Sequence, residues 1–324
     1  MEDKKINKCI LVGLGAIGMG YDLNISDKEV IHTHVKAINS HEDFELIAAV
    51  ELSETIRNIF TKKFNKPVFA ILEDALNLYQ ADVYIISCPT KYHLETIVTI
   101  LNVDSPKVIL CEKPLSYNIQ EAQEMVNLCH QKNVKLIVNY IRKSDIGVIE
   151  IKNRISSGKI KLPIKGTCYY SKGLYHNGSH FLNLLQFWLG KVSGYKLLKA
   201  GRNINEFDSE PDVLISFEKG DVVFFSNLEE NFAYHDIRLV SSSGIINYQN
   251  GGELIQISLF DIKSSKIEDF PETILTGMKS YQWHVMNNIS EMMKGNNSYS
   301  LCNSDDALAT IKLINKIINS YNVK

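Results

Sequence analysis

The feature that most constrains the fold of this chain is a glycine-rich segment close to its N-terminus. Gly13-Leu14-Gly15-Ala16-Ile17-Gly18 fits the pattern G-x-G-x-x-G and follows an apolar run that begins at Cys9. In such a turn the first glycine permits a sharp bend, the second lets a pyrophosphate approach the backbone, and the third lets the next helix pack against the strand. Amide N–H groups at the start of that helix can bind the phosphates. We therefore predict a dinucleotide site formed by Gly13, Gly15, Ala16, Ile17 and Gly18. A glycine-rich turn without a ligand is the alternative.

The first part of the chain alternates apolar runs with stretches of helical length. The runs, rich in Val, Ile and Leu, are at 9–15, 45–51, 81–87, 107–112 and 135–140. Helix candidates between them are at 32–40, 53–64, 92–102 and 118–132. Continuous apolar runs are typical of strands buried on both faces. This order predicts a Rossmann domain with a doubly wound parallel sheet over residues 1–142.

The pattern changes after about residue 142. Helix candidates at 146–156 and 178–189 are followed by alternating strands that form hairpins, at 212–230 and 235–248. Two further helices are expected at 273–294 and 304–320. We therefore predict a chain of the α/β class whose second domain, 143–324, is α+β with a large, mostly antiparallel, open-faced sheet. The last helix can pack back on the first domain.

An acidic residue, Glu51, ends the second predicted strand. A carboxylate there can accept both ribose hydroxyls and repels a 2′-phosphate, which favours NAD over NADP. Glu51 follows Gly18 by more than the roughly 20 residues usual for this motif, and the surplus matches the segment 19–31. We interpret that segment as an insertion, which is either an inert surface loop or a flap over cofactor or substrate.

Further motifs follow in order along the chain. They are Cys88-Pro89-Thr90-x-x-His93, Glu112-Lys113-Pro114, Asn139-Tyr140-Ile141-Arg142, His176-Asn177-Gly178-Ser179-His180 and Ser304-Asp305-Asp306-Ala307-Leu308. With the glycine turn, this series resembles the Gfo/Idh/MocA family, which includes glucose-fructose oxidoreductase and inositol dehydrogenases. The resemblance covers essentially the whole chain and implies activity on sugars, cyclitols or nucleotide sugars.

The resemblance implies that Lys113 is a catalytic and cofactor-binding residue beside the nicotinamide and the reacting carbon. An ammonium there would polarise and orient the substrate oxygen; an ordinary surface lysine is the alternative. Glu112 is expected to orient Lys113 or the cofactor, and Pro114 to fix a tight, often cis, turn.

His180 matches the catalytic histidine of the family. A histidine titrates near neutrality and can take or return the hydroxyl proton; a core or capping histidine is the alternative. The family often has aspartates four residues before and three residues after this histidine, where this chain has His176 and Asn183. His176 stays a candidate for catalysis and for substrate binding, although without a carboxylate partner the pKa of His180 should be raised less.

The remaining candidates are assigned by position. Those for the cofactor cleft are Cys88, Pro89, Thr90, His93 and Glu112. Those for binding the hydroxyls or an anionic group of the substrate are Tyr140, Arg142, Lys143, Lys172 and Tyr175. Helix-start residues or solvated side chains are the alternative for each. No metal site is expected, since His176 and His180 lack a third ligand. His34 is expected to take part in helix packing inside the first domain.

Charge and composition limit the partners. The formal net charge of −2 gives no electrostatic reason to expect nucleic acid or an anionic membrane. The polar N-terminus has no apolar leader region, so a cytoplasmic location is expected. The resemblance implies a homodimer or homotetramer formed through the second-domain sheet.

The sequence thus predicts an NAD-dependent oxidoreductase acting on CH–OH groups of a sugar-type small molecule. Lys113 would orient the oxygen and His180 would act as acid or base. The alternative from a different class is a non-catalytic NAD-binding sensor or regulator on the same scaffold, which the residues at 176 and 183 suggest. A metal-dependent hydrolase or aldolase is a third reading.

Overall fold

The computed structural model describes residues 5–227, 231–261 and 265–322, and the chain divides into two compact units. Unit 1 consists of Met1–Ile141 and Lys279–Leu308, and unit 2 of Arg142–Met278 and Ala309–Lys324. The chain first passes from unit 1 to unit 2 between Ile141 and Arg142, next to the boundary predicted after residue 142. Lys279–Leu308, however, belongs to unit 1, whereas the residues that precede it belong to unit 2. A division into independently folding domains stays a prediction.

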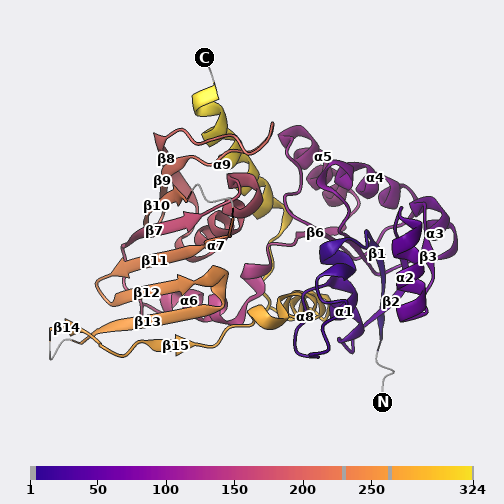
Figure 1. Cartoon of the computed structure of the whole chain (residues 1–324), viewed down its shortest axis with the longest axis horizontal. Coiled ribbons are helices and arrows are strands. Elements are labelled where there is room, and N and C mark those ends of the chain that lie inside the picture. The colour runs from indigo at the N-terminus through magenta and orange to yellow at the C-terminus, as the bar shows by residue number, and fades with distance from the viewer. Residues whose placement is uncertain (1–4, 228–230, 262–264, 323–324) are drawn as a thin grey trace. The chain divides into compact units, whose positions relative to one another are not determined.

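Unit 1 is built on a parallel sheet with the strand order β3-β2-β1-β4-β5-β6 (Figure 1). The strands are β1 (Asn7–Val12), β2 (Phe44–Val50), β3 (Val68–Phe69), β4 (Val83–Ile86), β5 (Val108–Cys111) and β6 (Lys135–Val138). Strands β4 and β5 are buried along their whole length, as the continuous apolar runs require. The predicted doubly wound sheet is therefore confirmed. Its order reverses between β1 and β4, where ligands of such folds bind at the carboxyl ends of the strands.

The helices of unit 1 begin largely where the sequence indicates. They are α1 (His34–Asn39), α2 (Glu54–Phe64), α3 (Leu72–Leu78), α4 (His93–Val103), α5 (Ile119–Gln131) and α8 (Tyr281–Met293). Side-chain caps set several starts: Thr33 accepts a hydrogen bond from Lys36 N, Ser53 from Ile56 N, and Asn118 from Gln120 N and Glu121 N. The short β3 and α3 were not predicted, because β3 is too short to show a period.

The segment 19–31 lies between the glycine turn and the first helix, α1, as the interpretation of an insertion there requires. The turn continues only into a π-helical turn, η1 (Ala16–Gly20), and α1 starts later, at His34. The buried carboxylate of Asp22 accepts hydrogen bonds from His32 N at 2.7 Å and from Thr33 N at 3.0 Å. Lys279 pairs with Asp27 and Glu29 at 3.0 and 2.8 Å. These contacts fix the segment against unit 1, and a role as a flap stays a prediction.

Unit 2 is built on a large sheet with the order β14-β13-β12-β11-β7-β10-β9-β8, and β15 pairs with β13 (Figure 1). The strands are β7 (Ile164–Tyr170), β8 (Val192–Lys199), β9 (Asp212–Phe217), β10 (Gly220–Ser226), β11 (Asp236–Ser241), β12 (Gly244–Gln249), β13 (Leu254–Asp261), β14 (Lys266–Ile267) and β15 (Glu272–Ile274). Pairing is antiparallel except between β7 and β10 in the described residues. The predicted mostly antiparallel sheet is confirmed.

Both predicted hairpins form, and glycine is required at their turns. A Cβ atom at Gly220 would lie 1.7 Å from Ile164 O, and one at Gly244 would lie 2.1 Å from Ser258 O. The end of the predicted hairpin at 212–230 lies outside the described residues from 228 onward.

Helices cover one face of the unit 2 sheet. They are α6 (Ile146–Ser156), α7 (Ser179–Leu189) and the part of α9 (Ser304–Asn322) that belongs to this unit. Trp188 of α7 contacts the ring of Tyr248 on β12, and its Nε1 donates to Val148 O of α6 at 2.9 Å. The opposite face carries exposed Tyr169 and Val240. An open-faced sheet was therefore predicted correctly.

One predicted element is wrong at its start. The helix expected at 273–294 begins only at Tyr281, because Glu272–Ile274 instead forms β15 and pairs with β13 through Ile274 and Ile255. β-branched Thr273 and Ile274 favour a strand where a neighbouring edge is available. Within the described residues, no helix combines the length and the apolar character that a membrane crossing requires.

Candidate active site

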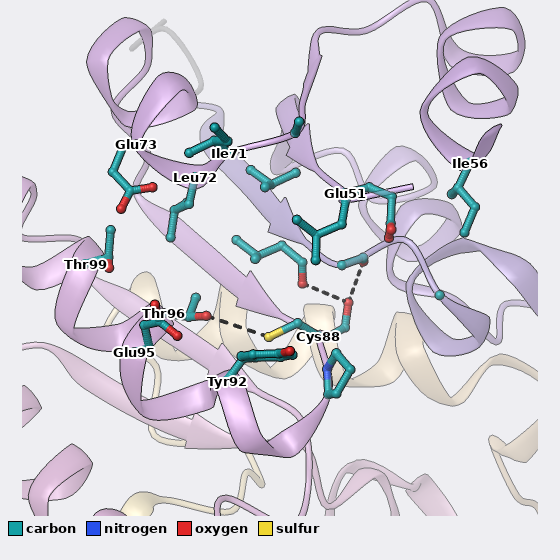
Figure 2. Close-up of a pocket in the computed structure, with 18 residues that line it drawn as sticks. Glu51, Ile56, Ile71, Leu72, Glu73, Cys88, Tyr92, Glu95, Thr96 and Thr99 are labelled. Carbon is teal, nitrogen blue, oxygen red and sulfur yellow. Dashed lines mark hydrogen bonds between the residues drawn. The ribbon is translucent and has the colours of Figure 1, made fainter. Parts of the chain in front are cut away.

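A cavity of about 700 Å³ opens at the carboxyl ends of β1, β2 and β4 in unit 1 (Figure 2). Predicted residues Gly13, Gly15, Glu51, Cys88 and Pro89 line it. The lining residues that the sequence analysis did not single out are Val12, Val50, Leu52, Ile56, Ala70, Ile71, Leu72, Glu73, Ser87, Tyr92, Glu95, Thr96 and Thr99. Several of them come from the unpredicted β3–α3 region, whose short elements carry no periodic signal.

The three glycines of the turn differ in what surrounds them. A Cβ atom at Gly13 would lie 2.6 Å from Cys88 N, and one at Gly18 would lie 2.3 Å from Gly13 O. Close backbone packing therefore requires glycine at both positions. A Cβ atom at Gly15 would meet nothing within 4 Å. Packing within the protein gives no reason for glycine there, whereas a ligand approaching the backbone would, and this space suits a pyrophosphate.

Glu51 is held at the cavity by two backbone donors. Its Oε2 accepts a hydrogen bond from Leu14 N at 2.8 Å, and its Oε1 accepts one from Ser53 N at 2.9 Å. A carboxylate oxygen can accept more than one hydrogen bond, so lone pairs remain for ribose hydroxyls. Arg57 of α2 folds back and donates through Nη1 to the carbonyls of Glu51 and Leu52, at 2.8 and 2.6 Å. This arginine was not predicted from the sequence.

The cavity has apolar walls and acidic ends. Leu52, Ile56, Ile71 and Leu72 present the flat apolar surface that a base ring favours. Glu73 and Glu95 contribute two further carboxylates, each in the first turn of a helix. Figure 2 shows Glu73 and Thr99 on the side of the cavity opposite Glu51 and Ile56. First-turn acids suit the helix dipole, so their position in sequence did not distinguish them.

His93 and Thr90 are not among the lining residues. His93 is buried, with Nδ1 at 3.0 Å from Leu115 O and Nε2 at 3.1 Å from Cys88 O. Burial lowers the pKa of His93. The ring thus connects the segment after β4 to the segment after β5, which is a supporting contact. Direct cofactor contacts by His93 and Thr90 stay predictions.

The Lys113 turn follows β5 and begins with a buried polar network. The Lys113–Pro114 peptide is cis, as the resemblance implies. Glu112 Oε1 lies 2.8 Å from His34 Nε2 and accepts a hydrogen bond from Asn139 Nδ2 at 2.6 Å. Asn139 Nδ2 also approaches Gln282 Oε1 at 3.2 Å. His34 is therefore more than a packing residue, because it positions the acidic residue beside Lys113.

Electrostatics hold Glu112 in its ionised form. Burial acts to raise the pKa of Glu112, but the hydrogen bond and charge of His34, the hydrogen bond from Asn139 and the charge of Lys113 outweigh it and lower that pKa. The backbone N–H of Lys113 donates to Glu112 Oε2 at 3.4 Å. A role of Glu112 in orienting Lys113 or the cofactor stays a prediction.

The predicted residues of unit 2 gather around the start of α7. Lys172 and Gly173 have φ angles of 62° and 93°, and a π-helical turn, η4 (Leu174–Gly178), leads from them into α7. Buried Asp208 accepts hydrogen bonds from Tyr175 N and His176 N, at 2.8 and 2.9 Å. Asp208 was not predicted, and it holds the backbone of the turn that carries the candidate residues.

Other candidates of the sequence analysis are placed as follows. Asn183 donates through Nδ2 to Thr310 Oγ1 at 3.2 Å, so it packs against α9. The guanidinium of Arg142 stacks on the ring of Phe181 at 4.6 Å, and buried Lys143 lies 5.4 Å from the ring of Phe187. Tyr140 and His180 are buried. No cluster of three or more His, Cys, Asp or Glu with metal-binding geometry occurs among the described residues.

Unit 1 has the Rossmann fold, in which dinucleotides bind at the carboxyl ends of the strands, where the cavity lies. Residues 8–140 match the family model GFO_IDH_MocA, described as an oxidoreductase family with an NAD-binding Rossmann fold. This match covers the segment that carries the dinucleotide motif, and it agrees there with the resemblance to the Gfo/Idh/MocA family noted from the motifs.

Similar proteins of known name match parts of the chain. Inositol 2-dehydrogenase of Salmonella typhimurium is 33% identical over 93 residues, which are 28% of this chain and 27% of that protein. D-xylose 1-dehydrogenase [NADP(+)] of Haloarcula marismortui is 34% identical over 90 residues, 28% of this chain and 24% of that protein. The chain thus matches only about a quarter of the length of these curated relatives.

Solved structures resemble the chain over nearly its whole length. An NAD binding oxidoreductase from Klebsiella pneumoniae has a TM-score of 0.78 at 16% identity and covers 98% of this chain and 97% of its own. The WlbA dehydrogenase from Bordetella pertussis, in complex with NADH and UDP-GlcNAcA, has a TM-score of 0.74 at 15% identity, with 98% and 97% coverage. At these identities the likeness establishes the shared fold.

The buried His34–Glu112 contact predicts a pH-dependent contribution to stability. Because the pKa of Glu112 is lowered in the folded chain, its stabilising effect is present above the unfolded value of about 4.3 and is lost as the pH falls through the folded pKa. His34→Leu should therefore cost about 1–3 kcal/mol of unfolding free energy near neutrality. That cost should shrink in strong acid, as measured by urea unfolding at about pH 7 and about pH 2.5.

His130→Leu is the matched control, because His130 is exposed on α5. It should leave the urea midpoint unchanged at both pH values. His34→Gln keeps an N–H donor and should recover part of the loss. A cost of His34→Leu that is the same at both pH values would contradict the proposed contact.

Proposed function

We propose that the chain is an NAD-dependent dehydrogenase or reductase that transfers hydride to or from a hydroxyl- or carbonyl-bearing carbon of a sugar, cyclitol or nucleotide sugar. The observation that carries this proposal is the open space at Gly15, in a turn where Gly13 and Gly18 are packed tightly. The cavity beside it and the Lys113 turn after β5 lie in the same unit. The match of residues 8–140 to the oxidoreductase family model and the names of the relatives support the reaction class.

The residues around the cavity fit NAD better than NADP. Glu51 can accept the ribose hydroxyls, and Glu73 and Glu95 add negative charge to the same cavity. A 2′-phosphate brings further negative charge, which like charges oppose. Bound NAD supplies the hydride acceptor, and NADH the donor.

Lys113 is the group that would hold the reacting oxygen. Its ammonium donates hydrogen bonds and stabilises the negative charge that develops on a carbonyl or alkoxide oxygen. The Glu112 carboxylate beside it is fixed by His34 and Asn139, so the turn that carries Lys113 starts from a rigid point. A fixed start limits the range of positions open to the ammonium, which favours orientation of the substrate.

His180 would exchange the hydroxyl proton. A neutral imidazole accepts the proton when the alcohol is oxidised, and an imidazolium returns it in reduction. Asn183 stands where the family often has an aspartate and is bonded to Thr310, so it does not supply a carboxylate to this histidine. His176 stays a candidate for binding substrate.

Assembly and location remain predictions of the sequence. The open face of the unit 2 sheet carries aromatic contacts between Tyr169, Phe225 and Tyr234, with ring centroids 5.6 and 5.9 Å apart. Exposed aromatic rings on an open sheet suit pairing with a second copy, as a homodimer or homotetramer requires. A cytoplasmic location also stays a prediction.

The alternative is an NAD-binding sensor or regulator without turnover. The replacement of the common family aspartate by Asn183, bonded to Thr310, favours it. Binding of NAD without NADH formation on any member of a broad panel of sugars, cyclitols and nucleotide sugars would decide for the sensor.

The space at Gly15 predicts a separation between folding and cofactor binding. Gly15→Ala should leave the melting temperature of the protein without NAD unchanged, because the added methyl group meets no protein atom within 4 Å. It should weaken the Kd for NAD by about tenfold or more, a loss of about 1.4 kcal/mol, because the methyl group occupies the approach to the pyrophosphate.

Gly18→Ala is the comparison variant, because its added methyl group should lower stability. Its Cβ would lie 2.3 Å from Gly13 O, and we expect a loss of about 1–3 kcal/mol of stability from overpacking. Calorimetric titration with NAD and thermal unfolding measure both properties. Normal NAD affinity in Gly15→Ala would show that the turn does not hold the cofactor.

The carboxylate of Glu51 predicts the choice of cofactor. Glu51→Ala removes an acceptor for the ribose hydroxyls and a charge that repels a 2′-phosphate, so the ratio of NADP affinity to NAD affinity should rise by at least about fivefold. Glu54→Ala removes the same charge from the exposed first turn of α2 and should leave the ratio unchanged. An unchanged ratio in Glu51→Ala would exclude Glu51 as the selective group.

The role of Lys113 predicts a loss of turnover without a loss of cofactor binding. In Lys113→Met, kcat should fall by about 100-fold or more on the panel sugar that gives the fastest NADH formation, because the oxygen loses its charged donor. The Kd for NAD should stay within about twofold. Lys62→Met, on the exposed face of α2, is the control and should be fully active. Turnover near the wild-type rate in Lys113→Met would remove Lys113 from the mechanism.

A further inference from the structure

Basic side chains gather at one end of the unit 2 sheet, where β7 ends and β11 begins. These strands pair antiparallel, with Asp236 opposite Tyr169 (Figure 1). Ser171 and Lys172 follow β7, and His235 directly precedes β11. Ser171 Oγ lies 3.5 Å from His235 Nε2. This pairing brings Lys172 and His235 to the same corner of the unit.

Arg142 joins this corner from the segment before α6. Its guanidinium stacks on the ring of Phe181 at 4.6 Å, and the same ring lies 5.1 Å from that of His235. Gly251 lies close to both Arg142 and His235. Its N–H donates to His235 O at 2.9 Å, and a Cβ added to it would lie 3.3 Å from Arg142 Nη2. Arg142 and His235 are therefore neighbours, and both contact the ring of Phe181.

The charges in this corner act on one another. Burial, followed by the positive charges of Arg142 and Lys172, lowers the pKa of His235 to about 4, and His176 adds to the effect. His235 is consequently neutral near pH 7. It offers one N–H donor, whereas Arg142 and Lys172 keep their charges.

Asp208, Asp145 and Asp236, in the segments around this corner, accept hydrogen bonds from other donors. Asp208 accepts from Tyr175 N and His176 N, and Asp145 accepts from Val148 N and Gly277 N at 3.0 and 2.6 Å. Asp236 adjoins His235 in sequence, but successive strand residues point to opposite faces, and its oxygens accept from Tyr234 and Asn250.

Arg142 and Lys172 therefore keep positive charge without an ionic partner. Across residues 5–227, 231–261 and 265–322, neither forms an ion pair with a carboxylate. The Nε of Arg142 is buried and has no hydrogen-bond partner there. A buried donor on a cation is costly unless a ligand satisfies it. Lys172 and His176 are exposed, so the corner is open to an incoming group.

We propose, building on the hydride-transfer function above, that the substrate is an anionic sugar derivative, a sugar acid or a sugar phosphate, whose negative group binds Arg142 and Lys172. Neutral His235 donates a third hydrogen bond to the same group. A guanidinium binds carboxylate or phosphate oxygens through paired N–H groups, and an ammonium adds a point charge. The proposal adds His235, which the sequence did not single out, to the substrate-binding residues.

Calorimetric titration of the full chain with matched ligands, in the presence and absence of NAD, tests the proposal. D-glucose is the neutral probe, D-glucuronate carries a carboxylate, and D-glucose 6-phosphate carries a phosphate; the two anions distinguish the chemical source. At least one anion should bind about tenfold or more tightly than glucose, and its affinity should fall as NaCl is raised. Equal or weaker binding of both anions would overturn the proposal.

Substitutions test whether the preference for anions comes from Arg142 and Lys172. Arg142→Gln and Lys172→Gln should each weaken binding of the preferred anion by about tenfold and leave glucose binding unchanged. Lys165→Gln is the control, because it removes the same charge from an exposed position on β7 and should bind as the wild type does. Melting temperatures identify a misfolded variant, and Lys172→Gln, at an exposed position, keeps the test decisive if Arg142→Gln is unstable. Anion binding that survives both substitutions would overturn the proposal.

The two proposals fail in different ways. NAD-dependent turnover of neutral sugars without any preference for anions would overturn the anionic substrate and leave hydride transfer intact. Anion binding that depends on Arg142 and Lys172, in a protein that forms no NADH with any sugar, would support the binding site and overturn the reaction.

Discussion

Close backbone packing at Gly13 and Gly18 is the constraint on which the candidate site depends. Any side chain at either position would collide with the backbone at Cys88 or at Gly13 itself. The turn can therefore form only with glycine at both ends. It packs the end of β1 against the segment after β4, at the place where the strand order reverses. The middle glycine is under no such constraint, and this difference supports the proposal that its side of the turn faces a ligand.

A second constraint on unit 1 is the network of polar contacts around Glu112. His34 of α1 and Asn139, which follows β6, both contact the residue before Lys113, and Asn139 also donates to Gln282 of α8. Burial of a carboxylate is costly, and these donors offset that cost while fixing its position. Unit 1 thus uses the same contacts for stability and for placing the start of the Lys113 turn.

In unit 2 the charges around Arg142 and Lys172 are arranged differently from those around Glu112. Its acidic side chains Asp208 and Asp145 satisfy backbone N–H groups, which leaves Arg142 and Lys172 without carboxylate partners among the described residues. An uncompensated positive corner costs stability in a free protein and favours an anion when one is present. At this corner the charges that favour an anion therefore lower the stability of the free protein. Around Glu112 the same contacts both stabilise unit 1 and place the start of the Lys113 turn.

The sequence by itself determined the class of each unit, the parallel and antiparallel sheets, the glycine turn, Glu51 and the Lys113 motif, because these signals lie in residues close together along the chain. It placed the start of α8 wrongly, since the strand β15 exists only where β13 offers an edge. The contacts of Glu112 with His34, and of Arg142 and His235 with Phe181, were decided by tertiary structure alone. Each joins residues far apart in sequence, and such pairings leave no local period or motif from which they could be predicted.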